Sequence, residues 1–291
     1  MAPSPDDYVT YKTVLSPELF AIAWQPFYDR AVRRTNDLKA KFLCKAGISY
    51  GDSLSQTLDI YFPASMTAKS PTLVFLHGGA FREGHPGQYG FVGEPYLERG
   101  AAFISAGYRV APEAYYPDQV DDLALLLGWL NRNLTSFGLN ASRMVVSGHS
   151  SGALMIALAS VRSDWQEHVG VPRNFLKSII VAGANYDHRT DSPTNLVRDL
   201  SRREEGTVIC NLQQVPEKAL IVFGNNEINT GDGRRFGRSG RALAAALAER
   251  GTVVEVIPLD TDHQGTCNAL CDPDSPVFRA AMLMLDERAR N

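Results

Sequence analysis

The stretch from Met144 to Arg162 decides the fold, and it reads Met-Val-Val-Ser-Gly-His-Ser-Ser-Gly-Ala-Leu-Met-Ile-Ala-Leu-Ala-Ser-Val-Arg. A short apolar run typical of a buried strand leads into Gly-His-Ser-Ser-Gly at 148–152, and helix-forming residues follow at once. A sharp turn between strand and helix pushes a serine out of the sheet edge, where a base can reach its hydroxyl. We therefore predict Ser150 as a nucleophile.

A second motif directly follows an earlier apolar run. Residues 72–76 lead into His-Gly-Gly-Ala-Phe at 77–81. When a serine attacks a carbonyl, negative charge collects on the oxygen, and backbone N–H groups already aimed at that oxygen stabilise it. We predict the N–H groups of Gly78, Gly79 and Ser151 as these oxyanion-hole donors. A simple turn, with the histidine packed against the sheet, is the alternative.

Short β-rich runs alternate with longer amphipathic runs along the chain. The expected strands are 58–62, 72–76, 101–106, 143–147, 178–182, 219–223 and 253–257. The expected helices are 118–133, 151–162, 233–250 and 277–290. This order is typical of an α/β fold in which helices cover both faces of a mostly parallel sheet.

Two segments break the alternation. Residues 17–45 have a helical pattern ahead of the first strand, and residues 186–215 are polar, Arg-rich and irregular. An active serine at a sheet edge needs material that excludes water and selects the substrate. We therefore assign residues 1–45, approximately, and 186–215 to a small cap on a single domain spanning 1–291. A helical extension and an ordinary loop are the alternative.

The composition limits the classes of partner and compartment. The 291 residues are 44% hydrophobic and 21% charged, which allows a large core, and the formal net charge of -3 gives no basis for a nucleic-acid or anionic-membrane partner. No apolar run is long enough to span a bilayer, and residues 1–8 lack the pattern of a secretory signal. We expect a cytoplasmic protein whose four cysteines are reduced.

The base must come from six histidines. His263 follows the last expected strand and precedes the final helix, a position that suits a base, although a surface histidine is the alternative. The other five occupy less suitable places, namely the serine turn, the glycine-rich loops, a polar stretch and the expected cap: His149, His77, His85, His168 and His188.

The expected strand 219–223 is followed by Gly-Asn-Asn-Glu, which ends at Glu227. A carboxylate here would orient the imidazole of His263 and stabilise the imidazolium formed during catalysis. We favour Glu227 for this role. Three aspartates compete with it: Asp232, Asp260 and Asp262.

His263, Cys267 and Cys271 are spaced four residues apart. On a helix they would share one face and resemble metal ligands. Pro273 soon follows, and no fourth ligand is apparent. We therefore expect no metal at these residues, and we interpret the two cysteines as small apolar residues.

Together these motifs resemble the hormone-sensitive-lipase-like branch of the α/β-hydrolases, and they are also similar to kynurenine formamidases. The resemblance covers Ser49 to the C-terminus and implies a cofactor-free hydrolase of carboxylic esters, sometimes amides, with part of its cap from the N-terminus. It rests on residues 58–63, 77–81, 108–113, 148–152, Glu227 and the late His263. The chain has Ala80, Phe81 and Glu227 where glycine, tryptophan and aspartate are more usual in these families.

We expect acyl transfer to water through an acyl-enzyme, with a small ester as substrate and an aromatic ester as one candidate. An amide hydrolase of the arylformamidase type is one alternative, and a non-catalytic binding protein on the same scaffold is another. A homodimer is a candidate assembly. The expected substrate-binding residues are Phe81, Tyr89, His149, Tyr115 and Tyr186.

Overall fold

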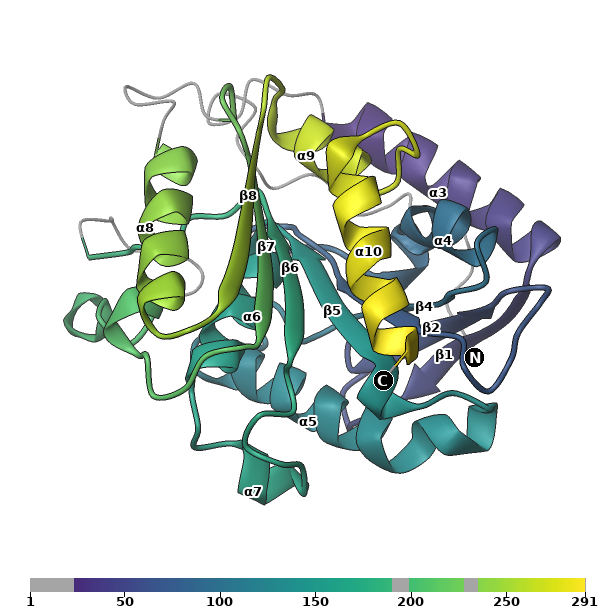
Figure 1. Ribbon diagram of the computed structural model, residues 1–291, viewed down its shortest axis with the longest axis horizontal. Coiled ribbons are helices and arrows are strands. Elements are labelled where there is room, and N and C mark those ends of the chain that lie inside the picture. The colour runs from purple at the N-terminus through teal and green to yellow at the C-terminus, as the bar shows by residue number, and fades with distance from the viewer. Residues whose placement is uncertain (1–23, 190–198, 228–234, 291) are drawn as a thin grey trace.

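The computed structural model describes residues 24–189, 199–227 and 235–290, and a central sheet dominates this part of the chain (Figure 1). The strand order is β1-β2-β4-β3-β5-β6-β7-β8. β1 and β2 run antiparallel to their neighbours, whereas β3 to β8 are parallel. The expected mostly parallel sheet is therefore confirmed. The strands are β1 (Leu43–Ser49), β2 (Thr57–Phe62), β3 (Thr72–Leu76), β4 (Ala102–Ala106), β5 (Met144–His149), β6 (Ser178–Ala182), β7 (Lys218–Gly224) and β8 (Val253–Leu259).

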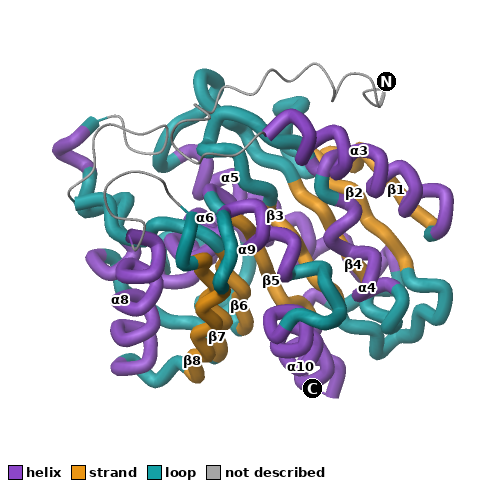
Figure 2. Tube along the Cα trace, turned by 90° about the horizontal axis from the view of Figure 1, so that it is seen from above, coloured by secondary structure: helices purple, strands orange, loops and turns teal. Residues whose placement is uncertain are grey.

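Helices cover both faces of the sheet, and each face has its own apolar cluster. Figure 2 shows α5 and α6 on one side of the strands and α10 on the other. The first cluster contains side chains of α5 (Asp118–Asn133), α6 (Ser151–Val161) and α8 (Arg235–Glu249). The second contains side chains of α3 (Trp24–Lys41), α4 (Glu94–Leu97), α9 (His263–Ala269) and α10 (Pro276–Arg290). A short helix, α7 (Gln166–Val169), follows α6.

The hydrophobic pattern of each strand and helix matches how far its residues are buried. Every residue of β3, β4, β5 and β6 is buried, as expected for parallel strands covered on both faces. Every residue of α6 is also buried, which fits its almost wholly apolar sequence. By contrast, α8 buries one stripe that includes Leu243 and Leu247, at the spacing of one helical turn. No helix in the described ranges is both long and apolar enough to cross a membrane.

The expected helix at 17–45 is wrong at its C-terminal end. The helix α3 stops at Lys41, and residues 43–45 belong to β1. Within the described ranges β1 is an edge strand paired with β2, and its side chains are mostly exposed, with Leu43 67% exposed. Such a strand has no alternating hydrophobic pattern to predict it from. Residues 17–23 lie outside the described ranges.

The motif at 108–113 has a structural role in this fold. The carboxylate of Asp122, which is 1% exposed, accepts hydrogen bonds from the backbone N–H and the guanidinium of Arg109. It also accepts one from Gln56 Nε2 at 2.6 Å. These bonds link the loop after β4 to α5. They also pair the buried carboxylate, which is stable only when it is fully paired.

Candidate active site

Ser150 occupies the turn between β5 and α6. Its backbone has φ 54° and ψ -121°, a conformation that is sparsely populated for any residue other than glycine. The turn is held by hydrogen bonds from Ser150 N to Ala182 O and from Leu154 N to Ser150 O. A Cβ at position 152 would lie 2.4 Å from the carbonyl oxygen of Leu76, so only glycine lets the helix pass β3 this closely.

The structure brings Ser150, His263 and Glu227 into one hydrogen-bonded chain. Ser150 Oγ lies 3.0 Å from His263 Nε2, and His263 Nδ1 lies 2.6 Å from Glu227 Oε2. The second carboxylate oxygen, Oε1, accepts a hydrogen bond from Gly224 N. The three groups come from the ends of β5, β7 and β8, where an α/β sheet places its site. The arrangement is that of a Ser-His-acid triad.

The competing aspartates lie elsewhere or outside the described ranges. Asp262 is the N-cap of α9, and its Oδ1 accepts a hydrogen bond from Gly265 N. Asp260 accepts a hydrogen bond from Asn226 Nδ2 at the surface. Asp232 falls within residues 228–234, which are not described. Among the described carboxylates, Glu227 is the one in contact with His263.

Burial pushes both members of this pair toward their neutral forms. It lowers the pKa of His263 well below its usual value, and the nearby charge of Asp262 opposes that change. Burial also raises the pKa of Glu227, and the hydrogen bond from Gly224 N counteracts the rise. A neutral imidazole can accept the proton of Ser150, so the direction of the His263 shift favours its use as a base at neutral pH.

A charge change at Asp262 should move the pH profile without removing activity. The Asp262 carboxylate raises the pKa of both His263 and Glu227, so an Asp262→Asn variant should lower the apparent pKa of the coupled pair. Because the base works only when deprotonated, the acid limb of kcat/KM should move to lower pH, by roughly 0.3 pH units at low salt and less at high salt.

Asparagine still caps a helix, so α9 should be retained in this variant. Asp260→Asn, another exposed carboxylate of the same loop, is the matched control and should leave the profile in place. A loss of activity by orders of magnitude in Asp262→Asn would instead identify Asp262 as the triad acid.

The predicted oxyanion donors lie against the serine. A Cβ at position 78 would be 2.9 Å from Ser150 Cβ, which places the Gly78 backbone directly beside Ser150. Among the described residues, none accepts a hydrogen bond from the N–H groups of Gly78, Gly79 or Ser151. Ser151 also begins α6, whose N-terminus favours negative charge nearby. These groups are available to an oxygen anion.

The histidine that opens the glycine motif is a packing residue. His77 is fully buried and stacks on Tyr108, with ring centroids 4.5 Å apart. The Tyr108 hydroxyl donates a hydrogen bond to His77 O and forms another with Ser151 Oγ, both at 3.0 Å. Tyr108 therefore connects the glycine loop to the serine turn, a role that its position in the 108–113 motif did not reveal.

A cavity of about 10 Å³ borders Ser150, room for a single water molecule. Of the five expected substrate-binding residues, Tyr89 and His149 line this cavity. His149 lies beneath His263, with its Nε2 3.0 Å from His263 O. Phe81 and Tyr186 are buried in the first apolar cluster, and Tyr115 is half-buried. None of these three residues lines the cavity.

Two aromatic residues at the site lie outside the recognised sequence motifs. Trp24 of α3 lines the cavity beside Ser150, and its ring centroid lies 5.8 Å from that of His263. Phe236 of α8 lies 5.7 Å from the same imidazole. Both come from segments far from Ser150 in sequence, so only folding brings them here. Trp24 does fall within the segment assigned to the cap.

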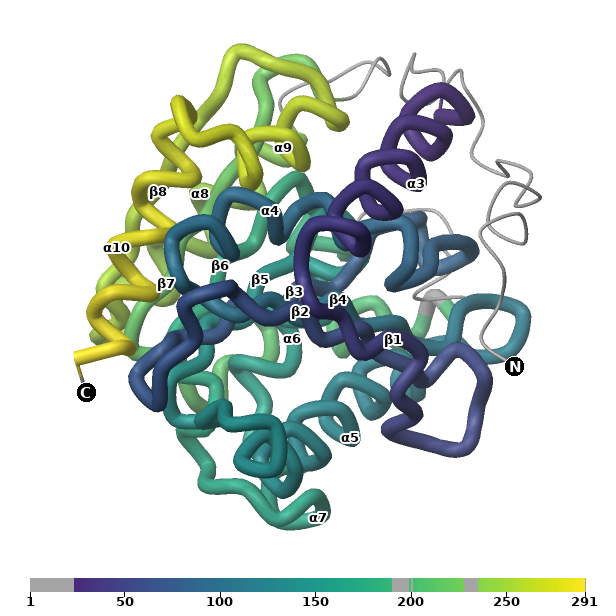
Figure 3. The backbone as a smooth tube through the Cα atoms, turned by 90° about the vertical axis from the view of Figure 1, so that its right-hand side faces the viewer, coloured from purple at the N-terminus to yellow at the C-terminus, as the bar shows by residue number. Residues whose placement is uncertain are grey.

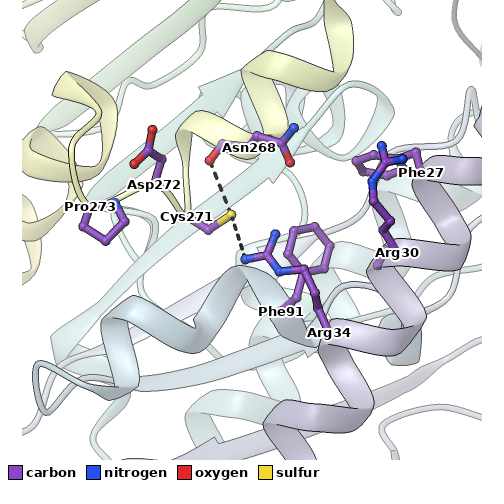
Figure 4. A pocket seen from close by; sticks show the side chains of 9 residues that line it. Phe27, Arg30, Arg34, Phe91, Asn268, Cys271, Asp272 and Pro273 are labelled. Carbon is purple, nitrogen blue, oxygen red and sulfur yellow. Dashed lines mark hydrogen bonds between the residues drawn. The ribbon is translucent and has the colours of Figure 1, made fainter.

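The possible metal ligands do not share a site. His263 is engaged with Ser150 and Glu227, while Cys267 is fully buried in the second apolar cluster. Cys271 Sγ lies between Asn268 O and the guanidinium of Arg34, as Figure 4 shows. In the described ranges, no group of three or more His, Cys, Asp or Glu side chains is arranged to hold a metal ion.

Comparison with known proteins finds sequence similarity to esterases and kynurenine formamidases. The BD-FAE family model matches residues 58–190. A kynurenine formamidase of Danio rerio is 26% identical over 82% of this chain and 80% of its own length. The isoprenylcysteine alpha-carbonyl methylesterase ICME of Arabidopsis thaliana is 28% identical over 55% of this chain, which spans 35% of that protein. The chain has the α/β-hydrolase fold.

Solved structures share the fold of this chain at low sequence identity. A truncated carbohydrate esterase from gut microbiota superposes with a TM-score of 0.68 at 18% identity, covering 85% of this chain and 96% of that one. Esterase B from Lactobacillus rhamnosis gives a TM-score of 0.67 at 16% identity, covering 91% of this chain and 94% of that one. The expected similarity to esterases and kynurenine formamidases is therefore confirmed.

Proposed function

We propose that this chain is a serine hydrolase that cleaves a carboxylic ester of a small substrate through an acyl-enzyme. The observation that carries the proposal is the chain from Ser150 Oγ through His263 to Glu227, with contacts of 3.0 and 2.6 Å. Relatives named as esterases support the choice of ester. The small cavity beside Ser150 favours a short acyl group. Trp24 and Tyr89 line this cavity and suit a substrate that carries an aromatic ring.

The proposed reaction needs no group beyond the side chains, the backbone and water. His263 Nε2 takes the proton of Ser150 as Oγ attacks the carbonyl carbon. The resulting oxyanion accepts hydrogen bonds from the N–H groups of Gly78, Gly79 and Ser151. His263 then gives this proton to the departing alcohol, leaving the acyl group on Ser150. Water, deprotonated by the same imidazole, attacks the acyl carbon, and His263 returns that proton to Ser150 Oγ as the bond from Oγ to the acyl carbon breaks and the acid is released. Glu227 stabilises the imidazolium in both steps.

An amide hydrolase of the formamidase type is the second candidate. The observation that favours it is coverage, because the Danio rerio kynurenine formamidase aligns with 82% of this chain, whereas the ICME esterase aligns with 55%. The chemistry would be the same except that the leaving group is an amine, which must be protonated by His263 before it departs. The two candidates therefore differ in the leaving group and share the catalytic residues.

A paired substrate panel separates these candidates. Phenyl formate, phenyl acetate and phenyl butyrate would be compared with formanilide, acetanilide and butyranilide, so that acyl length and the bond type vary independently. We expect turnover of the short esters, with kcat/KM falling from acetate to butyrate. Faster turnover of formanilide than of phenyl acetate would favour the amide hydrolase.

The same preparation would be treated with a fluorophosphonate, which reacts with activated serines. We expect one equivalent of label, located at Ser150 by peptide mass spectrometry. Absence of both label and turnover would support a non-catalytic binding protein on this scaffold and overturn the proposal.

A further inference from the structure

The loop that carries two oxyanion donors has an unfavourable backbone conformation. Gly79, Ala80 and Phe81 follow one another with φ of 135°, 51° and 60°. Positive φ costs energy in residues that carry a Cβ, and such conformations persist only where the surroundings enforce them. At position 79 a Cβ would lie 2.0 Å from the carbonyl oxygen of Glu83, which shows how tightly the loop folds back on itself.

The loop turns back through Glu83. The N–H groups of Arg82 and Glu83 both donate to Gly79 O, at 2.9 and 3.1 Å. The Glu83 side chain then runs beneath the loop, because its Cγ is 3.1 Å from the point where a Cβ of residue 79 would lie. Glu83 is 2% exposed. A carboxylate this deeply buried needs hydrogen-bond donors, and the catalytic steps make no use of it.

A donor to Glu83 comes from a distant helix. The Tyr28 hydroxyl on α3 donates to Glu83 Oε1 at 3.0 Å, and both residues are buried. Burial and the adjacent Glu83 raise the pKa of Tyr28 well above its usual value, so its hydroxyl stays protonated and able to donate. This bond joins residues that are 55 positions apart in sequence. It links Glu83, which closes the 79–81 loop, to α3.

The same helix also meets the catalytic base. Trp24 lies one turn before Tyr28, and it contacts His263 with ring centroids 5.8 Å apart. Figures 1 and 3 both place α3 and α9, which begins at His263, at the upper end of the molecule. Farther along α3, Arg34 packs on Phe91 and reaches Cys271 just after α9 (Figure 4). One helix therefore supports both the oxyanion loop and the base.

We propose that Tyr28 and Glu83 are positioning residues that hold the 79–81 loop in its catalytic conformation, so that docking of α3 sets the strength of the oxyanion hole. The inference rests on the proposed acyl-transfer function. Neither residue lines the cavity beside Ser150. Their hydrogen bond acts by keeping the N–H groups of Gly78 and Gly79 aimed at the oxygen on which charge develops.

The test compares Tyr28→Phe, which removes only the hydroxyl, with Tyr61→Phe. Tyr61 is a buried tyrosine of β2 whose hydroxyl donates to the Asp59 carboxylate at 3.4 Å and which does not line the cavity at Ser150. We expect Tyr28→Phe to lower kcat for a phenyl ester about tenfold with KM changed less than about twofold, because the oxyanion forms only during reaction. Tyr61→Phe should keep wild-type kcat.

Two further measurements distinguish positioning from partial unfolding. A trifluoromethyl ketone forms an oxyanion adduct on the serine, so its affinity should fall by the same factor as kcat/KM in Tyr28→Phe. Hydrogen exchange should quicken at the backbone amides of residues 79–84 in this variant and not in Tyr61→Phe. Glu83→Gln, which keeps an acceptor oxygen, should lose less activity than Glu83→Leu.

Wild-type kcat, unchanged inhibitor affinity and unchanged exchange in Tyr28→Phe would overturn the inference. An equal loss in Tyr28→Phe and Tyr61→Phe would overturn it too, because it would show a general effect of disturbing the core. A wild-type protein that neither turns over esters nor binds the ketone would instead contradict the proposed function. The exchange measurement would still report whether the Tyr28 hydroxyl restrains the loop.

Discussion

Replacing Ser150 with alanine is expected to lower kcat for a short phenyl ester by about 10⁵-fold. The physical reason is that an alanine side chain at this position offers no atom to bond with the acyl carbon, while the N–H groups of Gly78 and Gly79 stay in place. His263→Ala should cost a similar factor, because residues that act as one unit do not contribute additively.

The measurement is steady-state hydrolysis combined with fluorophosphonate labelling. Ser150→Ala should take up no label, whereas His263→Ala should label far more slowly than the wild type. Ser160→Ala is a matched control, because Ser160 is a buried serine of α6 whose hydroxyl bonds to Ala157 O within its own helix. Retention of most of the activity in Ser150→Ala would show that the turn at residues 148–152 is not the catalytic centre.

Glu227→Gln is expected to lower kcat by about 10³-fold to 10⁴-fold while the fold is retained. The side-chain carbonyl oxygen of the introduced glutamine would accept the hydrogen bond from Gly224 N, as Glu227 Oε1 does now, which turns the amide NH₂ toward His263 Nδ1. An imidazole that accepts a hydrogen bond at Nδ1 carries its proton on Nε2. In that tautomer it cannot take the proton of Ser150.

Glu227→Asp is the comparison variant, because it keeps the charge and shortens the side chain by one methylene. We expect it to lose less activity than Glu227→Gln. Thermal unfolding of both variants would establish that they are folded at the assay temperature. If Glu227→Gln retained activity within about threefold of the wild type, the acid would have to be another carboxylate, and Asp232 would be the next to test.

Much of the site could be predicted because its residues lie in short local motifs. Ser150 stands between a strand and a helix that are both apolar enough to be recognised, and Gly78 and Gly79 directly follow another buried strand. The turn and the loop are dictated by neighbours in sequence, so each motif carries its own structural context. His263 and Glu227 were found in a similar way, as polar residues just beyond strands β8 and β7.

The parts that escaped prediction depend on contacts between distant segments. β1 shows no hydrophobic alternation, because it is an edge strand whose side chains are mostly exposed. Phe81 and Tyr186 follow strands at the expected end of the sheet, yet both side chains turn into the core and do not line the cavity at Ser150. An aromatic residue after a strand can pack inward or outward, and the surrounding volume decides between these directions.

The local order of residues was enough to define an α/β sheet, a serine at its edge, two glycine N–H groups and a late histidine, since backbone geometry and hydrophobic periodicity act over a few residues. The aromatic contact of Trp24, the Tyr28–Glu83 bond and the position of Asp262 at the start of α9, away from the His263–Glu227 contact, required the folded chain. Each of these depends on side chains from separate elements meeting within a few ångströms, and sequence spacing carries no record of that distance.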